Sequence, residues 1–257
     1  DLWLPEGSSF DATERVVKRF EQQIAQDPDA ADYVAYVGVG APRFYLPLDQ
    51  QLNHTNFAQF MVVSRDLAAR ERLKTRMHDW LAAGYPEVRS KIDRLPNGPP
   101  VGWAVQFRIQ GPDPAQVRAF TDEALNVVRA SPLVRNVHDN WHEPIAVMNL
   151  DIDAEKLKVL GISHEQVRGA GNTILTGTPI GNYRERTRNI EVLARQPLSE
   201  RNSLGSLRDA YMPTASGQSV PFSQFGVAKP GFELGVLWRR DRQFAITIQA
   251  ETPAGLQ

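Results

Sequence analysis

A strand that runs directly into a pair of helices, over residues 147–167, constrains the fold more than any other stretch of this chain. Its first part alternates apolar and polar residues, which is typical of a strand, and from Asp153 the apolar spacing becomes helical. Asp153 is suited to cap the first helix, and Gly161 to end it in a left-handed turn. Ser163, followed three residues later by Gln166, predicts a capping box that opens a second helix.

The first 95 residues predict a ferredoxin-like unit, in which two helices cover one face of an antiparallel sheet. The expected order of elements is strand, helix, strand, strand, helix, strand. Asp11 and Glu14 predict a capping box for the first helix, which should end before Asp27 and Pro28. The later elements are expected at residues 33–39, 57–63, 65–84 and 88–95.

A second unit begins in the same way as the first. A strand at 103–110 precedes a helix capped by Asp113, and strands at 134–138 and 145–152 follow. The apolar face of this helix is expected at Val117, Phe120, Ala124, Val127 and Val128. Beyond residue 167, short strands are expected at 189–194, 210–212, 219–221, 236–240 and 244–251. Because only the last two return to the second unit and no second helix is predicted, that unit is incomplete and interrupted by an insertion.

Composition excludes several classes of protein. The formal charge of −1 gives no electrostatic reason to expect a nucleic acid as partner. The chain has no cysteine, which suits an oxidising compartment. No run of about 18 apolar residues is present, so no membrane-spanning helix is predicted. Because the chain opens inside a predicted strand, we expect it to be part of a longer polypeptide.

Enzyme signatures are absent from the sequence. It contains no nucleophile elbow, phosphate-binding loop or zinc-protease helix, and the glycine pair Gly38 and Gly40 does not lead into a helix. His138, Asp139, His142 and Glu143 lie within six residues and carry side-chain types that bind zinc. The alternative is a solvated polar turn with Asn140 and Trp141 at its tip. We therefore expect no enzyme, no cofactor and no metal site.

Several motifs, in order, identify a family that the chain resembles. They are "LPEGSSFDATERV" near the start, then "LDIDAEKLKVLGIS", "ILTGTPIGNY", "SGQSVPFSQF" and "WRRDRQFAITIQAE". Together they resemble the second large periplasmic loop of the resistance-nodulation-division (RND) multidrug exporters, and the match runs through almost the whole chain. Lys91 to Leu95 depart from the pattern, because well-known drug exporters carry phenylalanines at that strand.

The resemblance implies an α+β fold with two ferredoxin-like (βαββαβ) porter subdomains, the second incomplete, and a small inserted α+β docking subdomain. The first porter subdomain would span 1–98, the second 99–152 with 238–257, and the docking insertion 153–237. The resemblance also implies a proton-driven antiporter in the inner membrane of a Gram-negative cell, with this portion in the periplasm. Its partners would be small amphiphilic substrates, a periplasmic adaptor protein, an outer-membrane channel and two further copies in a homotrimer.

The expected substrate-binding residues are Phe44, Tyr45, Phe60, His138 and Trp141. Phe44 and Tyr45 lie in the loop that, in the family, separates an outer from an inner substrate pocket; alternatively, the two rings pack beneath their own loop. Phe60 belongs to a core face by its pattern, with one face of the sheet lining the cleft. By resemblance, His138 and Trp141 face the entrance cleft.

Methionines decide between two branches of the family. The branch that exports metals passes soft Cu(I) or Ag(I) ions along thioether sulfurs. Met61, Met77, Met148 and Met212 lie on different predicted elements, which favours plain packing. The expected cargo is therefore hydrophobic or amphiphilic compounds, with a heavy-metal (Cu/Ag) pump and, less favoured, a periplasmic metal-dependent enzyme as the alternatives.

Overall fold

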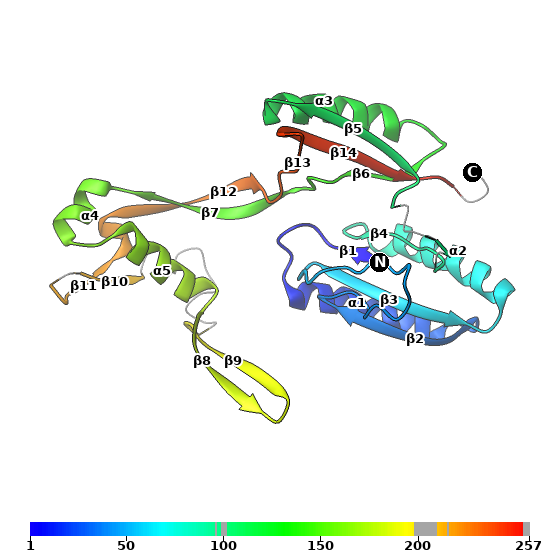
Figure 1. Cartoon of the computed structure of the whole chain (residues 1–257), viewed down its shortest axis with the longest axis horizontal. Helices are drawn as coiled ribbons and strands as arrows, with labels where there is room; N and C mark the ends of the chain where they lie inside the picture. Colours follow the sequence, from blue (N-terminus) through cyan, green and yellow to red (C-terminus); the bar gives the residue numbers. More distant parts are fainter. Residues whose placement is uncertain (96, 99–101, 198–209, 215, 254–257) are drawn as a thin grey trace. The chain divides into compact units, whose positions relative to one another are not determined.

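The computed structural model describes residues 1–95, 97–98, 102–197, 210–214 and 216–253 (Figure 1). The chain divides into two compact units. Unit 1 comprises residues 1–145 and 233–257, and unit 2 comprises residues 146–232. Among the residues that the structure describes, no helix combines the length and the apolar character needed to cross a bilayer.

The first half of unit 1 is a complete ferredoxin-like module. Its elements are β1 (Leu2–Trp3), α1 (Phe10–Gln26), β2 (Ala30–Val37), β3 (Phe57–Ser64), α2 (Leu67–Gly84) and β4 (Arg89–Ser90). The strand order is β2-β3-β1-β4, and neighbouring strands are antiparallel. The sequence predicted this order of elements, although the last strand covers only two of the eight residues expected.

The two helices of this module pack against one face of the sheet. Buried side chains at helical spacing form the core with Leu2 and Tyr85, and these are Val16, Phe20, Ile24, Leu73, Met77 and Leu81. The cap of α1 differs from the expectation: Ser9, not Asp11, is the N-cap, and its hydroxyl accepts from the amide of Ala12 at 3.2 Å. Ser9 has the extended backbone that a cap requires.

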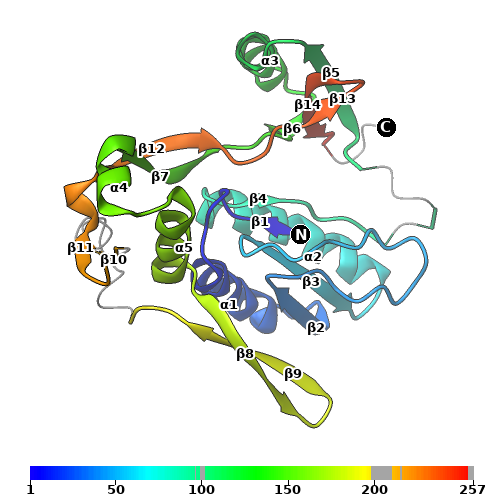
Figure 2. The ribbon, with the colours of Figure 1, turned by 60° about the vertical axis from the view of Figure 1, so that its left-hand side comes forward.

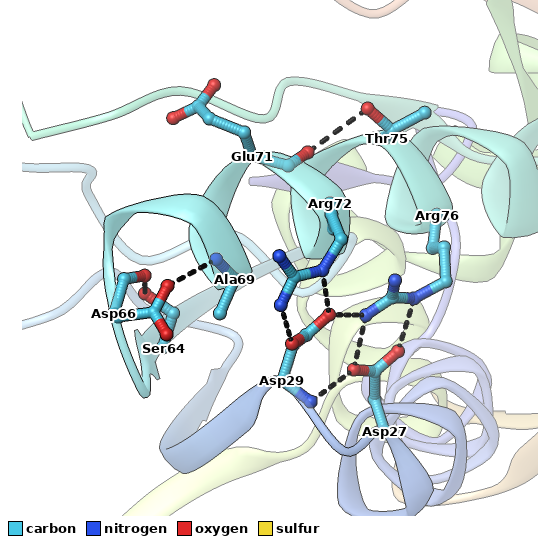
Figure 3. A network of polar contacts seen from close by, with 9 residues as sticks. All are labelled: Asp27, Asp29, Ser64, Asp66, Ala69, Glu71, Arg72, Thr75 and Arg76. Atoms are coloured by element: carbon cyan, nitrogen blue, oxygen red, sulfur yellow. Dashed lines mark hydrogen bonds and ion pairs between the residues drawn. The ribbon is translucent and has the colours of Figure 1, made fainter.

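Four charged residues fasten α2 to the turn that follows α1 (Figure 3). Arg76 donates to both Asp27 oxygens at 2.6 Å and to Asp29 at 2.6 Å, while Arg72 donates to Asp29 at 3.0 and 2.5 Å. The bonds from Arg72 and then Arg76 lower the pKa of Asp29 to about 2. Arg76 likewise lowers the pKa of Asp27, the side chain of which is 2% exposed.

The second half of unit 1 is the start of a similar module. Its elements are β5 (Val105–Gly111), α3 (Pro114–Arg129), β6 (Arg135–Asp139), β13 (Arg239–Arg240) and β14 (Gln243–Glu251). β14 lies between β5 and β6, as β3 lies between β1 and β2 in the first module. This arrangement confirms that the first module's architecture is repeated in part.

The buried face of α3 was predicted only in part, since Val117 is buried as expected and two other predicted positions are exposed. Phe120 and Val127 are 58% and 74% exposed, whereas Val117, Thr121 and Leu125 are buried. Thr121 is tolerated inside because its hydroxyl donates to the carbonyl of Val117 at 2.7 Å. Because the Thr121 hydroxyl has its hydrogen-bond partner within the helix, this polar residue occupies a buried position that a pattern of apolar residues does not predict.

The link between the units also differs from the expectation. β7 (Pro144–Ile152), expected beside the strands of the second module, pairs instead with β12 (Gly226–Leu234), a strand that the sequence did not predict. Lys229 reaches Asp151 across this pair at 2.8 Å. Glycines are needed in β12, because a Cβ at Gly226 would lie 2.5 Å from the Phe222 ring.

The helical part of unit 2 forms as predicted. α4 (Ala154–Leu160) is capped by Asp153 and ends at Gly161, which has a φ of 65°. α5 (His164–Leu175) opens with the capping box of Ser163 and Gln166. The buried core around these helices contains Leu157, Ile162, Val167, Met212, Phe222 and Phe225.

Strands form much of the remaining described part of unit 2. β10 (Tyr211–Pro213) pairs with β11 (Ser219–Pro221), which precedes a 3₁₀ turn at Phe222–Gln224. β8 (Thr178–Glu185), which the sequence did not predict, forms a hairpin with β9 (Arg188–Ala194). In both views the hairpin extends away from α5 as a bare ribbon (Figures 1 and 2).

Candidate functional site

An aromatic pair stands on the loop between β2 and β3. The rings of Phe44 and Tyr45 lie 5.4 Å apart at 30°, and Phe44 is 58% exposed while Tyr45 is half-buried. The Arg43 guanidinium donates to the carbonyl of Leu46, which closes a local turn around the pair. The ring of Phe44 thus faces solvent and does not pack beneath its own loop.

Both ends of this loop are anchored to the module. The amide of Ala41 donates to the Gln59 side chain at 2.6 Å, and Ala41 and Leu48 are buried. Gly40 passes so close to Gln51 that a Cβ would lie 2.9 Å from its side chain. The loop therefore presents Phe44 from a fixed base, which lowers the entropy lost when the ring is covered.

Phe60 and Trp141, two other expected binding residues, are committed to packing. Phe60 makes an edge contact with Phe20 at 5.3 Å in the core of the first module. Trp141 is 0% exposed, and its indole N–H donates to the carbonyl of Ala245 at 3.0 Å. Neither ring offers the open face that a ligand needs in this conformation, and the binding role of both residues stays a prediction.

The expectation that Trp141 sits at the tip of a solvated turn is wrong. The Asp139 carboxylate accepts from the amides of Trp141 and His142 at 2.9 and 3.1 Å, and His142 takes a φ of 61°. These bonds fold the turn back on itself and direct the indole into the core of the second module, against Phe244.

His138 belongs to an aromatic cluster that sequence reasoning missed. Its ring lies 4.3 Å from that of Trp103, and Trp103 lies 6.2 Å from Trp3. All three side chains are half-buried. The cluster joins Trp3 of β1, Trp103 just before β5 and His138 of β6. Trp103 and His138 are each 100 residues or more from Trp3 in the sequence. Tryptophans at strand ends were the available signal, but nothing in the sequence pairs them.

Two cations border this cluster. The Arg89 guanidinium lies 5.8 Å from the ring of Trp3, and the Lys91 ammonium lies 5.4 Å from that of Trp103. Burial lowers the pKa of Arg89, the side chain of which is 12% exposed and 3.9 Å from Glu143. Cations over aromatic faces are attracted by the ring quadrupole.

The histidines of this region are kept neutral. Burial lowers the pKa of His138 to about 4, and it also lowers the pKa of His142. The Nδ1 of His138 donates to the carbonyl of Asn136 at 2.7 Å, which fixes the ring against Trp103. At neutral pH the cluster therefore combines aromatic faces with the guanidinium of Arg89 and the ammonium of Lys91, which is paired with Asp93 at 3.1 Å.

A metal site does not form from the residues weighed for one. Asp139 accepts from Arg118 at 3.0 Å in addition to the two turn amides, so its oxygens are occupied. Within the described residues, no group of three or more His, Cys, Asp or Glu side chains is placed to hold a metal ion.

The family follows from comparison with known proteins. The model of the AcrB/AcrD/AcrF family matches residues 2–257. The chain belongs to this family of RND efflux pumps. The resemblance read from the ordered motifs is thereby confirmed. None of the curated proteins matches the chain.

The fold of this RND chain is similar to that of solved structures. Two X-ray crystal forms of a heavy metal efflux pump match 98% of it, with TM-scores of 0.77 and 0.75 and 16% sequence identity. The predicted mixed α+β fold is confirmed. The chain spans 26% and 27% of those two proteins, so the activity, substrates and partners of the whole pump are matters for proposal.

Proposed function

We propose that this chain is the periplasmic substrate-binding and docking portion of an inner-membrane, proton-driven RND pump that exports hydrophobic and amphiphilic compounds. Residues 1–98 would form one porter subdomain, 99–152 with 238–257 the second, and 153–237 the docking insertion. The observation that carries the choice of cargo is the Phe44–Tyr45 pair on an anchored loop, of which the Phe44 ring is 58% exposed. Two adjacent aromatic rings offer a large apolar face that can contact an apolar compound.

Broad recognition requires large rigid faces with few fixed polar demands, which aromatic side chains supply. The cluster of Trp3, Trp103 and His138 adds such faces, and Arg89 and Lys91 add positive charge beside them. We propose that His138 contacts cargo there and that Phe44 and Tyr45 form the more exposed contact. Compounds that combine an aromatic body with a negative group fit this chemistry best.

Transport would consist of opening and closing movements of the two ferredoxin-like modules. A bound compound biases such an equilibrium only if it binds one arrangement better than the other. In the complete pump, three copies would meet a periplasmic adaptor protein and an outer-membrane channel. Proton transfer would use residues outside this chain.

The test is a resistance profile of the full-length pump carrying Phe44→Ala, Tyr45→Ala or both. We expect the set of exported compounds to narrow while the amount of folded pump is unchanged. Phe120→Ala is the matched control, because that ring is also 58% exposed but lies on α3. An unchanged profile in the double variant, or equal losses in the control, would refute the proposed role of the pair.

A heavy-metal pump is the second candidate, favoured by the two solved structures of that description. The methionines of this chain lie apart: Met77 and Met212 are buried in separate cores, and Met148 packs in a third cluster. The half-buried Met61 is the one left to bind a soft ion. Titration of the chain with Ag(I) against a competing chelator tests this candidate. Tight binding that Met61→Leu removes and Met77→Leu retains would favour metal over amphiphiles.

A further inference from the structure

Unit 2 contains a groove of about 340 Å³ between one face of β7 and one face of α5. From β7 it is lined by Met148, Leu150 and Ile152, which alternate along the strand and so share a face. From α5 it is lined by side chains three, four and seven residues apart, which share a helical face. They are His164, Val167, Arg168, Gly171, Asn172 and Leu175, and the C-cap residue Thr176 completes the lining.

Gly171 creates the open space in the middle of the helical wall. A Cβ built at this position would meet no atom within 4 Å, although the residue is buried and lies in the interior of α5. Glycine costs a helix interior about 1 kcal/mol relative to alanine. Its φ is not in the left-handed region, so the backbone of α5 gives no reason for glycine here. The missing side chain leaves room for something else against the strand.

The groove has an apolar floor and a basic rim. Met148, Leu150 and Ile152 are half-buried, and Leu175 at one end is 47% exposed. Arg168 stands on the rim, and no lining residue is acidic. The nearby carboxylate of Asp151 is engaged by Lys229, and that of Asp153 caps α4. Charge complementarity therefore favours an occupant that is apolar along its length and negative at one end.

We propose that this groove binds an anionic amphiphile with a single alkyl chain. The chain would lie along the three β7 side chains, over roughly 13 Å of strand, and the negative head would meet Arg168. The volume of the groove is at the lower end of the range for small-molecule sites. None of the residues that line the groove belongs to the aromatic residues proposed above to contact cargo. The proposal therefore does not depend on which cargo the pump exports.

The test uses the 257-residue chain with ¹³C-labelled methionine methyl groups, of which it has four. The probe is decanoate below its micelle concentration, and Met148→Leu assigns the reporting signal. We expect the Met148 methyl signal to shift and saturate, while Met61 and Met77, in unit 1, stay in place. Decyltrimethylammonium, with the opposite charge on a similar chain, should bind at least about tenfold more weakly.

Two variants on one helix make the test specific. Gly171→Leu fills the groove and should abolish the shift, whereas Gly169→Leu, also with open space around its Cβ but outside the groove, should leave it unchanged. Arg168→Gln should retain the fold and remove the preference for the anion. The proposal fails if Met148 does not respond, if Gly171→Leu responds like the native chain, or if both probes bind equally. It also fails if Met148 shifts with protein concentration alone, which would identify a second copy as the occupant.

Discussion

Arg76 donates two hydrogen bonds of 2.6 Å to Asp27, and so a residue in the middle of α2 holds the turn that ends α1. Asp27 is almost completely covered, with 2% of its side chain exposed, whereas Arg76 is 34% exposed. The pair therefore contributes more than a typical surface ion pair, because without Arg76 the covered carboxylate keeps, within the described part of the chain, only its bond from the amide of Asp29, at 2.8 Å.

Arg76→Ala should destabilise the first module by about 2 kcal/mol, less than the full cost of breaking a buried pair because Arg76 is partly solvated. Arg72→Ala should cost less, since it removes bonds only to Asp29, which keeps its bond from Arg76. Urea denaturation of the two variants measures both losses. Equal losses would contradict a special role for the buried carboxylate.

The exposed face of α3 gives a second prediction. Phe120→Ala should change the stability by no more than about 0.5 kcal/mol, because the ring is 58% exposed. Leu125→Ala on the same helix should cost about 3 kcal/mol, because that side chain is 3% exposed. Denaturation curves of the two variants distinguish the observed face from the one that apolar spacing alone predicts. If Phe120→Ala lowered the stability more than Leu125→Ala, the result would contradict the observed face and support the predicted one.

The parts of the fold that the sequence predicted are those set by local interactions. Asp153, Gly161 and the pair of Ser163 and Gln166 each act within four residues, so their pattern alone places α4 and α5. The face of α3 was predicted only in part: Val117 is buried as expected, but Thr121, which satisfies its hydroxyl within its own helix, is buried where the apolar pattern did not place it.

The parts that the sequence could not predict depend on distant partners. β12 is interrupted by Gly226, Pro230 and Gly231, which argue against a strand, yet the glycines make room for side chains that pass close by. The Trp3–Trp103 contact is likewise invisible until β1 and the start of β5 are brought together. Of the candidate site, the Phe44–Tyr45 loop was predicted and the tryptophan cluster was not.

Acid should destabilise unit 1 through two half-buried histidines. Burial lowers the pKa of both His138 and His78 to about 4, from 6.5. Between pH 6.5 and pH 4 the unfolded chain binds protons that the folded chain does not. The free energy of unfolding therefore has its full value, as far as these histidines are concerned, above pH 6.5, and it decreases as the pH drops toward 4. His142 shifts in the same direction.

Replacing both His78 and His138 with glutamine should reduce this dependence by about two protons in the slope of unfolding free energy against pH. Each single variant should reduce it by about one. Urea denaturation at a series of pH values from 7.5 to 4 gives the slopes. A double variant with the native slope would show that neither imidazole is kept neutral by the fold.

The hydrogen bond of the buried Trp141 indole predicts a loss of stability on substitution that the change in ring size does not explain. Trp141→Phe retains most of the ring but removes the donor to Ala245, and it should cost about 1 to 2 kcal/mol because a buried carbonyl loses its bond. Trp238→Phe is the control, since that ring is 55% exposed and should change little. Thermal unfolding compares them, and equal stability of the two variants would contradict the contribution of the hydrogen bond.

Replacement by alanine should change the stability in opposite directions at two glycines of unit 2. Gly161 ends α4 with a φ of 65°, so Gly161→Ala places a Cβ against the following carbonyl and should cost about 1 kcal/mol. Gly169 lies within α5 with no atom within 4 Å of a built Cβ, so Gly169→Ala should stabilise that helix by up to about 1 kcal/mol. Hydrogen exchange of the α4 and α5 amides reads both effects locally. If both variants exchanged faster, α5 would need glycine at 169 for a reason that its helical geometry does not supply.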